Sequence, residues 1–261
     1  MTKQITNSVP EGGDELEELV AHILQECGLI VQHQAVLQLP RGAVTVDVLA
    51  KETVESVTYQ IICECKNWST NVPQEKVHAF RTVVSEAGAN RGYIISRTGF
   101  QSGAVEAARS TNIELVSFAE FQAIFFDKWI KNRTWAIERD IGAILSYYEP
   151  FGIPGINQLT NEAEQESYYN VWLKYLFVGA LLPLFSPYLR QFRPHPYPDL
   201  PLDLTPYEDP RVVVPKDVAE ATSCRKLLSL LQAYAKAGLA ELRAMNPITR
   251  GKSESEINRD D

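Results

Sequence analysis

The chain has 261 residues, of which 45% are hydrophobic and 22% are charged. This is enough apolar material for one large or two small globular domains, and it excludes a wholly disordered chain. The formal net charge of −8 at pH 7 argues against a broadly basic surface for nucleic acid, because neutralised phosphates supply most of the affinity of such surfaces. The polar start from Met1 to Ile5 predicts no secretory signal, so we expect a cytoplasmic protein.

The first predicted helix begins with Asp14 as its N-cap and stops at Gly28. Its apolar residues recur at helical spacing, so one face belongs to a core. At 100° per residue, Glu17 lies on the flank of that face, whereas Glu18 points to solvent. Residues 29–39 then read as a first strand.

Two further strands are predicted at residues 43–50 and 59–68, separated by a polar break at Lys51-Glu52 and Glu55-Ser56. Strand alternation would place the side chains of residues 44, 46 and 48 on one face of the strand and those of residues 45, 47 and 49 on the other. On the next strand it would place Glu64 and Lys66 on one face and Cys63 and Cys65 on the opposite, apolar face.

Pairing these two strands can bring Asp47, Glu64 and Lys66 together at the end of a sheet. Two neighbouring carboxylates repel each other unless a cation lies between them, and ligation by oxygen alone suits Mg²⁺. A nearby lysine can stabilise an anionic transition state or help to deprotonate a water. The same pattern also occurs by chance on solvated hairpins, so this alternative stays open on these residues alone.

The remaining elements of this half are helix 73–88, strand 93–96, helix 102–108, strand 113–116 and a helix from Phe118. This order predicts an α/β fold, a mixed sheet sandwiched by helices. Trp68 either packs under the sheet, which we favour, or contacts a ligand. Ser96, Arg97 and Thr98 lie where a strand meets a helix start, a place suited to phosphate.

The four cysteines lack the spacing of zinc ligands and lie within apolar patterns, so we expect buried, reduced thiols. They are Cys27, Cys63, Cys65 and Cys224.

Four stretches occur in the order and at the separations of a known family. They are Leu16-Glu17-Glu18-Leu19-Val20-Ala21, Val46-Asp47-Val48-Leu49-Ala50, Cys63-Glu64-Cys65-Lys66-Asn67-Trp68, and Tyr93-Ile94-Ile95-Ser96-Arg97-Thr98-Gly99-Phe100 with Ala104 and Ala107-Ala108. From about residue 14 to about residue 121 the chain thus resembles the catalytic domain of Mrr-like restriction endonucleases, in the PD-(D/E)xK nuclease superfamily. Val46, Glu64 and Gln101 depart from the family pattern, and Glu64 is the commoner choice across the superfamily.

The resemblance implies a restriction-endonuclease-like fold and a metal-dependent DNA endonuclease, in defence against foreign, phage or modified DNA. It implies Asp47 and Glu64 as ligands of Mg²⁺, for which Mn²⁺ could substitute, Lys66 as a catalytic residue, and Glu17 as the acid of the first helix that supports the site. The alternatives are a Holliday-junction-type resolvase and a catalytically silent DNA-binding or scaffold module. Intact Asp47, Glu64 and Lys66 argue against the silent module.

Residues 1–127 hold nine Lys or Arg against sixteen Asp or Glu, a balance of −7. DNA contact would therefore need a local basic patch or the rest of the chain. We expect a nuclease domain at residues 1–127, a helical C-terminal domain at 128–245 and a disordered tail at 246–261. Helices are expected at 129–148, from 162 to about 185, and at 218–245, with a proline-rich connector between the last two.

A membrane span is not expected, because the apolar run from Tyr175 to Phe185 is too short and contains Pro183. We expect this run and the apolar face from Cys224 to Leu242 to mediate a homo-oligomer, most readily a dimer. The region could equally sense a signal or dock a regulatory partner protein.

Overall fold

A computed structural model describes residues 4–148, 152–192, 194–205, 209–252 and 256 of the chain. The chain divides into two compact units, an N-terminal unit of residues 3–133 and a C-terminal unit of residues 134–261. The division falls inside helix α4 (Phe118–Ile141), which runs without a break past the boundary that we expected after Asp127.

A five-stranded sheet forms the centre of the N-terminal unit, with its strands in sequence order. β1 (Ile30–Leu39), β2 (Gly42–Val54) and β3 (Val57–Lys66) form an antiparallel meander, and β4 (Arg91–Ser96) and β5 (Ile113–Val116) continue it in parallel. The mixed sheet and its flanking helices have the predicted α/β architecture of a restriction endonuclease.

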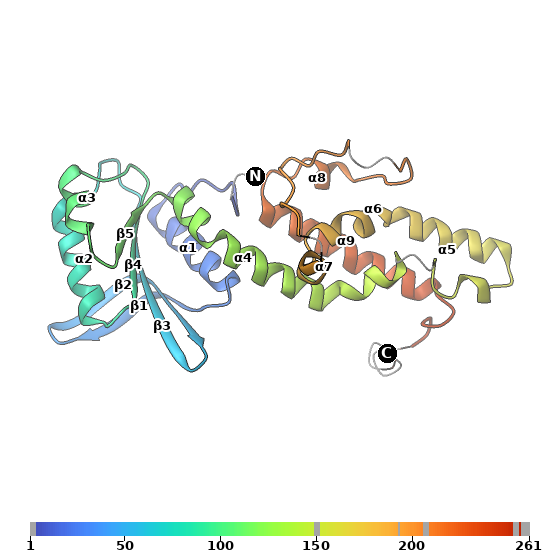
Figure 1. The fold of residues 1–261 in the computed structure, drawn as a ribbon, viewed down its shortest axis with the longest axis horizontal. Coiled ribbons are helices and arrows are strands. Elements are labelled where there is room, and N and C mark those ends of the chain that lie inside the picture. Colours follow the sequence, from blue (N-terminus) through green and yellow to red (C-terminus); the bar gives the residue numbers. More distant parts are fainter. Residues whose placement is uncertain (1–3, 149–151, 193, 206–208, 253–255, 257–261) are drawn as a thin grey trace. The chain divides into compact units, whose positions relative to one another are not determined.

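Helices cover both faces of this sheet (Figure 1). On one face lie α2 (Gln74–Glu86) and α3 (Ser102–Ala108), which pack on a core that includes Leu49, Ile62 and Ile94. Gly92 allows α2 to approach closely, because a Cβ there would lie 2.7 Å from Phe80. The other face is covered by α1 (Gly13–Glu26) and by the start of α4, whose rings contact Tyr93.

Two predictions about a turn and a helix cap in this unit are wrong. The hairpin turn between β2 and β3 consists of Glu55 and Ser56 alone, with φ of 48° and 71°, while Lys51 and Glu52 continue β2. Two residues at positive φ form the tight turn that suits the twist of the flanking strands. Asp14 lies in the first turn of α1 instead of capping it, since the N-cap is Gly12.

The C-terminal unit is helical, as expected, but its helices are more broken than the sequence pattern suggested. After α4 it contains η1 (Gly142–Tyr147), η2 (Ile156–Gln158), α5 (Glu162–Lys174), α6 (Leu176–Leu181), η3 (Leu182–Leu184), α7 (Pro187–Phe192), α8 (Lys216–Ala219) and α9 (Cys224–Met245). Ser223 caps α9 through its side chain, so the helix predicted at 218–245 is two helices. The stretch predicted from residue 162 is interrupted after Lys174.

The two apolar faces that we expected to mediate a dimer are buried within this unit. α5 and α6 both pack against α9, and Phe177, Val178 and Leu181 are at most 2% exposed. Leu227, Leu228 and Leu231 on α9 are fully buried. Because these faces cover each other, they no longer provide a reason for a second copy to bind there.

Residues 246–252, expected to begin a disordered tail, instead form turns. Asn246 is 3% exposed, and its backbone N–H donates to the carbonyl oxygen of Leu242 at 2.9 Å. The expected disorder at 253–255 and 257–261 lies outside the described residues. Within the described ranges, no helix combines the length and apolar character needed to cross a membrane.

Candidate active site

The carboxylate of Asp47 lies where β2 separates from β3. The ladder between these strands ends at the pair Val48 and Cys63. Asp47 directly precedes Val48 on β2, and its Oδ2 accepts a hydrogen bond of 2.7 Å from the backbone N–H of Cys65 on β3. The side chain of Asp47 thus takes the place of a strand partner for β3.

The alternation of β2 changes at this point, which corrects the predicted placement of Val46. Val46 belongs to the same packed core cluster as Leu49 and Ile62, on the α2 side of the sheet, although strict alternation would put Val46 and Leu49 on opposite faces. Across the β1–β2 ladder, Gln34 faces Asp47 between the pairs His33–Val48 and Ala35–Val46. Gln34 has φ of +52°, so the backbone of β1 is distorted directly beside the site.

Glu64 and Lys66 come together on β3 as the sequence predicts. Lys66 Nζ lies 2.6 Å from Glu64 Oε1, and the two side chains are 15% and 26% exposed, respectively. Both line a groove of about 170 Å³ between the ends of β2, β3 and β4 and helix α2. Its other lining residues are Val44, Thr45, Val46, Lys76, Ala79, Phe80, Val83 and Ile94.

Negative charge is concentrated around Asp47. Burial and then the charge of Glu64 raise the pKa of Asp47 to about 6, against the opposing effects of the Cys65 N–H and the Lys66 ammonium. Glu17 contributes a smaller increase in the same direction. A cation between the two carboxylates would favour the ionised form of Asp47 and lower this pKa again.

Glu17 reaches the same region from α1 and is held by two residues of β1. It is 9% exposed, its Oε2 lies 3.0 Å from His33 Nε2, and the side-chain amide of Gln34 donates to the same oxygen. Glu18 is exposed, so the predicted phase of this helix is correct. We did not single out His33 or Gln34 from the sequence, because the sequence carries no signal for the distortion of β1 at Gln34.

The residues present fit an Mg²⁺ ion. Asp47 and Glu64 each use one carboxylate oxygen within the protein and keep the other. Among the described residues, no three His, Cys, Asp or Glu side chains converge as a metal-binding group. Two carboxylates are nevertheless the usual protein share for Mg²⁺, which keeps several waters and takes substrate phosphate as a further ligand.

The cysteines are buried free thiols, as expected. Cys63 is fully buried and Cys65 is 5% exposed. Burial raises the pKa of both thiols, which keeps them protonated and unsuited to bind metal.

The three predicted phosphate contacts differ in what the structure leaves accessible. Ser96 is buried, and its hydroxyl donates to the carbonyl oxygen of Gly99. The Thr98 hydroxyl donates to the carbonyl oxygen of Thr70 at 2.8 Å. Arg97 is exposed, and its backbone N–H donates to the carbonyl oxygen of Lys66, so its side chain is the one suited to a phosphate.

Trp68 is 36% exposed, instead of packing under the sheet as we favoured. The ammonium groups of Lys66 and Lys76 lie 5.6 Å and 5.9 Å from the centre of its ring. Both distances are within the range of cation–π attraction.

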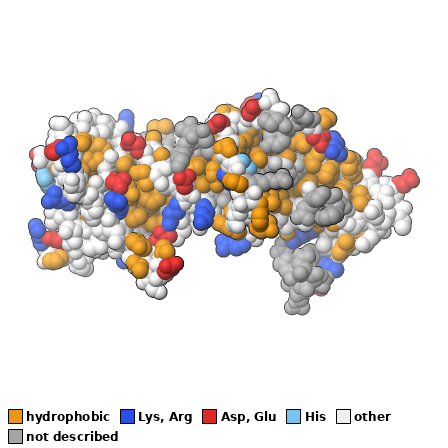
Figure 2. All heavy atoms as spheres, in the orientation of Figure 1, with side chains coloured by type: hydrophobic (Ala, Val, Ile, Leu, Met, Phe, Trp, Pro, Cys, Tyr) orange, Lys and Arg blue, Asp and Glu red, His pale blue; other side chains and the backbone are white. Residues whose placement is uncertain are grey.

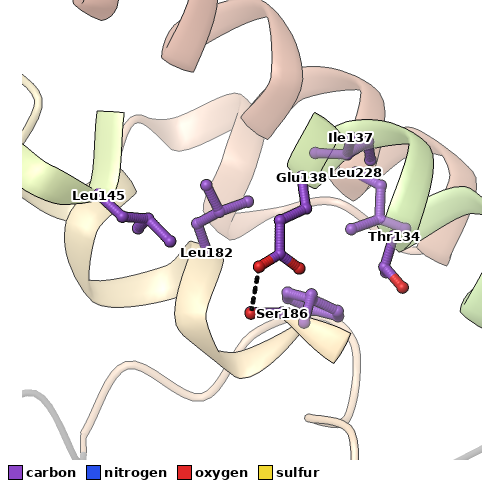
Figure 3. A pocket seen from close by; sticks show the side chains of 8 residues that line it. Thr134, Ile137, Glu138, Leu145, Leu182, Ser186 and Leu228 are labelled. Carbon is purple, nitrogen blue, oxygen red and sulfur yellow. Dashed lines mark hydrogen bonds between the residues drawn. The ribbon is translucent and has the colours of Figure 1, made fainter. Parts of the chain in front are cut away.

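The C-terminal unit contains a separate small cavity of about 10 Å³ (Figure 3). Glu138 points into it among the apolar side chains of Ile137, Leu145, Leu182 and Leu228, and Ser186 Oγ donates to Glu138 Oε1 at 3.1 Å. The space is about that of one water molecule, so we do not regard it as a substrate site.

Two solved structures are similar to about half of the chain. Among solved structures, the chain is similar to a protein of unknown function, AF1548, with 16% identity over 50% of this chain and 82% of that one and a TM-score of 0.35. It is also similar to the DNA modification-dependent restriction endonuclease AspBHI, with 8% identity, a TM-score of 0.28 and coverage of 48% of this chain and 39% of that one.

No curated protein matches the chain. Residues 11–125 match the model of the restriction endonuclease family Mrr_cat. This range contains β1 to β5 and every residue of the site built above. Residues 11–125 are therefore an Mrr-like restriction endonuclease domain.

Proposed function

We propose that the chain is a Mg²⁺-dependent endonuclease that hydrolyses phosphodiester bonds in DNA, with Asp47, Glu64 and Lys66 as its active site. The observation that carries this proposal is the position of Asp47, where β2 parts from β3, close enough to Glu64 and Lys66 for both charges to shift its pKa. Glu64 and Lys66 pair with each other and line the groove beside α2.

Each residue has a distinct role in this proposal. Asp47 and Glu64 would hold the ion, and the Cys65 N–H fixes the orientation of the Asp47 carboxylate. Lys66 supplies positive charge at the phosphate as negative charge develops there, and Glu64 holds its ammonium in place. Glu17, fixed by His33 and Gln34, adds a third carboxylate charge that strengthens attraction for the cation.

When bound, Mg²⁺ supplies a Lewis acid that neutralises charge on the phosphate. Mn²⁺ accepts the same oxygen ligands and could replace it. The cleavage test is incubation of the full chain with linear and branched DNA in Mg²⁺, Mn²⁺ and EDTA. Cleavage of linear DNA in Mg²⁺ or in Mn²⁺, but not in EDTA, supports the proposal. Cutting confined to branched junctions would favour a resolvase. No cutting with any metal would favour a silent binding module.

The biological setting that fits this activity is defence against foreign DNA in the cytoplasm. An uncontrolled nuclease would endanger its own host, so we place the control, by a signal or a regulatory partner protein, in the C-terminal unit. One active site cuts one strand at a time, so double-strand cleavage calls for two copies of the chain on the DNA. Light scattering with and without a DNA duplex tests for this homo-oligomer.

A further inference from the structure

The positive charge available to DNA in the N-terminal unit is scarce. On the face visible in Figure 2, basic and acidic side chains of this unit are interspersed. Arg41, Arg91, Arg109 and Lys128 are each paired with a glutamate. Among the cations described in this unit, those that form no ion pair include Lys51, Lys76, Arg81 and Arg97.

Lys76 is the member of this unpaired group that lines the groove with Glu64 and Lys66. It lies in the first turn of α2, where its backbone N–H donates to the carbonyl oxygen of Pro73. Its side chain is exposed and lies over the ring of Trp68. The charge of Lys66 is already balanced by Glu64 at 2.6 Å, so Lys76 supplies the groove's remaining positive charge.

Neither Lys76 nor Trp68 is needed to complete the core. The indole remains 36% exposed, and no carboxylate of the described chain pairs with the Lys76 ammonium. An exposed cation–π contact contributes only about 0.5–1 kcal/mol. This is a small stabilisation for a large aromatic ring that stays partly exposed to water. The pair is better explained as a surface that is completed by a ligand with a negative charge and a flat apolar part.

We propose that Lys76 and Trp68 bind the backbone of the DNA strand that is cut. Their contacts lie next to the scissile phosphate, whose developing negative charge Lys66 stabilises. Lys76 contacts a neighbouring phosphate, and Trp68 holds the lysine stem in position and offers its exposed ring to the adjoining sugar or base. This inference rests on the proposed function and adds a substrate contact on α2 outside the group of Asp47, Glu64 and Lys66.

The test is fluorescence anisotropy of a labelled DNA duplex with the metal-free full chain, across a series of salt concentrations. The variants are Lys76→Ala, Lys76→Arg and the matched control Lys51→Ala, whose lysine is exposed and unpaired on β2 but does not line the groove. Metal-free conditions separate binding from cleavage.

We expect Lys76→Ala to weaken binding about threefold to tenfold and to reduce the slope of log K against log salt by about one. Lys76→Arg should keep the wild-type slope, and Lys51→Ala should resemble the wild type. Equal behaviour of Lys76→Ala and Lys51→Ala, or weaker binding with an unchanged slope, would overturn the inference and leave the proposed activity intact. Failure of the wild type to bind DNA would overturn both.

Discussion

The backbone N–H of Cys65 donates to the carboxylate of Asp47 at 2.7 Å, at the point where the ladder between β2 and β3 ends. A side chain thus replaces a backbone partner and holds Asp47 between two strands instead of above the sheet. The same bond places Asp47 beside Glu64, the residue directly before Cys65.

The first prediction concerns the cleavage chemistry. Asp47→Asn keeps an oxygen that can accept from Cys65 but removes the charge that would hold the ion, so we expect Mg²⁺-dependent cleavage to fall at least about a hundredfold. Glu64→Gln and Lys66→Met should behave alike. Plasmid cleavage measures the loss, and circular dichroism checks that each variant is folded. Activity of Asp47→Asn near the wild-type level would remove Asp47 from the site.

The second prediction concerns stability in the absence of metal. The pKa of Asp47 is raised from 3.8 to about 6, so the folded protein holds this proton more tightly than the unfolded chain does. Stability consequently falls as pH rises from about 4 to about 6, and the full penalty applies above that range. Asp47→Asn avoids the penalty.

After a discount for solvent screening, we expect Asp47→Asn to gain about 1 kcal/mol, or roughly 2–4 °C in melting temperature, at pH 8 in EDTA. Melting in EDTA at pH 8 and at pH 4 checks this, because the gain should disappear at the lower pH. Mg²⁺ should stabilise the wild type and not the variant, because an ion that binds only the folded site raises the stability of the fold. A gain of the same size at both pH values would contradict the electrostatic explanation.

Much of the N-terminal unit could be predicted because its elements carry clear periodic patterns. The strand 113–116 and the helix 102–108 have the expected bounds, and Glu17 lies on the expected flank of its helix. The meeting of Glu64 and Lys66 follows from strand alternation alone, since two residues separated by one position share a face.

The distortion at Gln34 could not be predicted, because a positive φ in a non-glycine residue depends on contacts made after folding. Directly beside it, Val46 packs in the same cluster as Leu49, and the Gln34 amide donates to Glu17. Neither contact has a local sequence pattern. The C-terminal helices carry strong apolar patterns. Such a pattern does not reveal whether the apolar face packs against another helix of the same chain or against a second copy. Here α6 and α9 pack together within one chain.

The third prediction separates the two neighbouring acids of α1. Glu17→Gln removes a charge near Asp47 and weakens the contacts with His33 and Gln34, so we expect a several-fold to tenfold loss of cleavage at limiting Mg²⁺ that higher Mg²⁺ partly restores. Glu18→Gln is the matched control, because Glu18 is exposed on the same helix. Mg²⁺ titrations of cleavage compare the two variants. Equal losses would mean that Glu17 has no special relation to the site.

The last prediction concerns Glu138 in the C-terminal unit. Its Oε1 accepts from Ser186, but its buried Oε2 has no hydrogen-bond partner among the described residues. A buried oxygen without a partner costs free energy, and the cavity around it is lined by leucine and isoleucine side chains. We therefore expect Glu138→Leu to raise the stability of this unit by about 1 kcal/mol, or roughly 2–4 °C in melting temperature.

Thermal unfolding of the full chain measures this change. Glu166→Leu is the control. Glu166 is exposed on α5, so this variant has the same change of side chain but does not fill a cavity. The control should leave the melting temperature unchanged or lower it. DNA cleavage by Glu138→Leu should also be measured, because activity retained together with higher stability is the expected result for a packing residue. A lower melting temperature would mean that the carboxylate makes a favourable interaction in the cavity, such as with a bound water, that outweighs the cost of burying it.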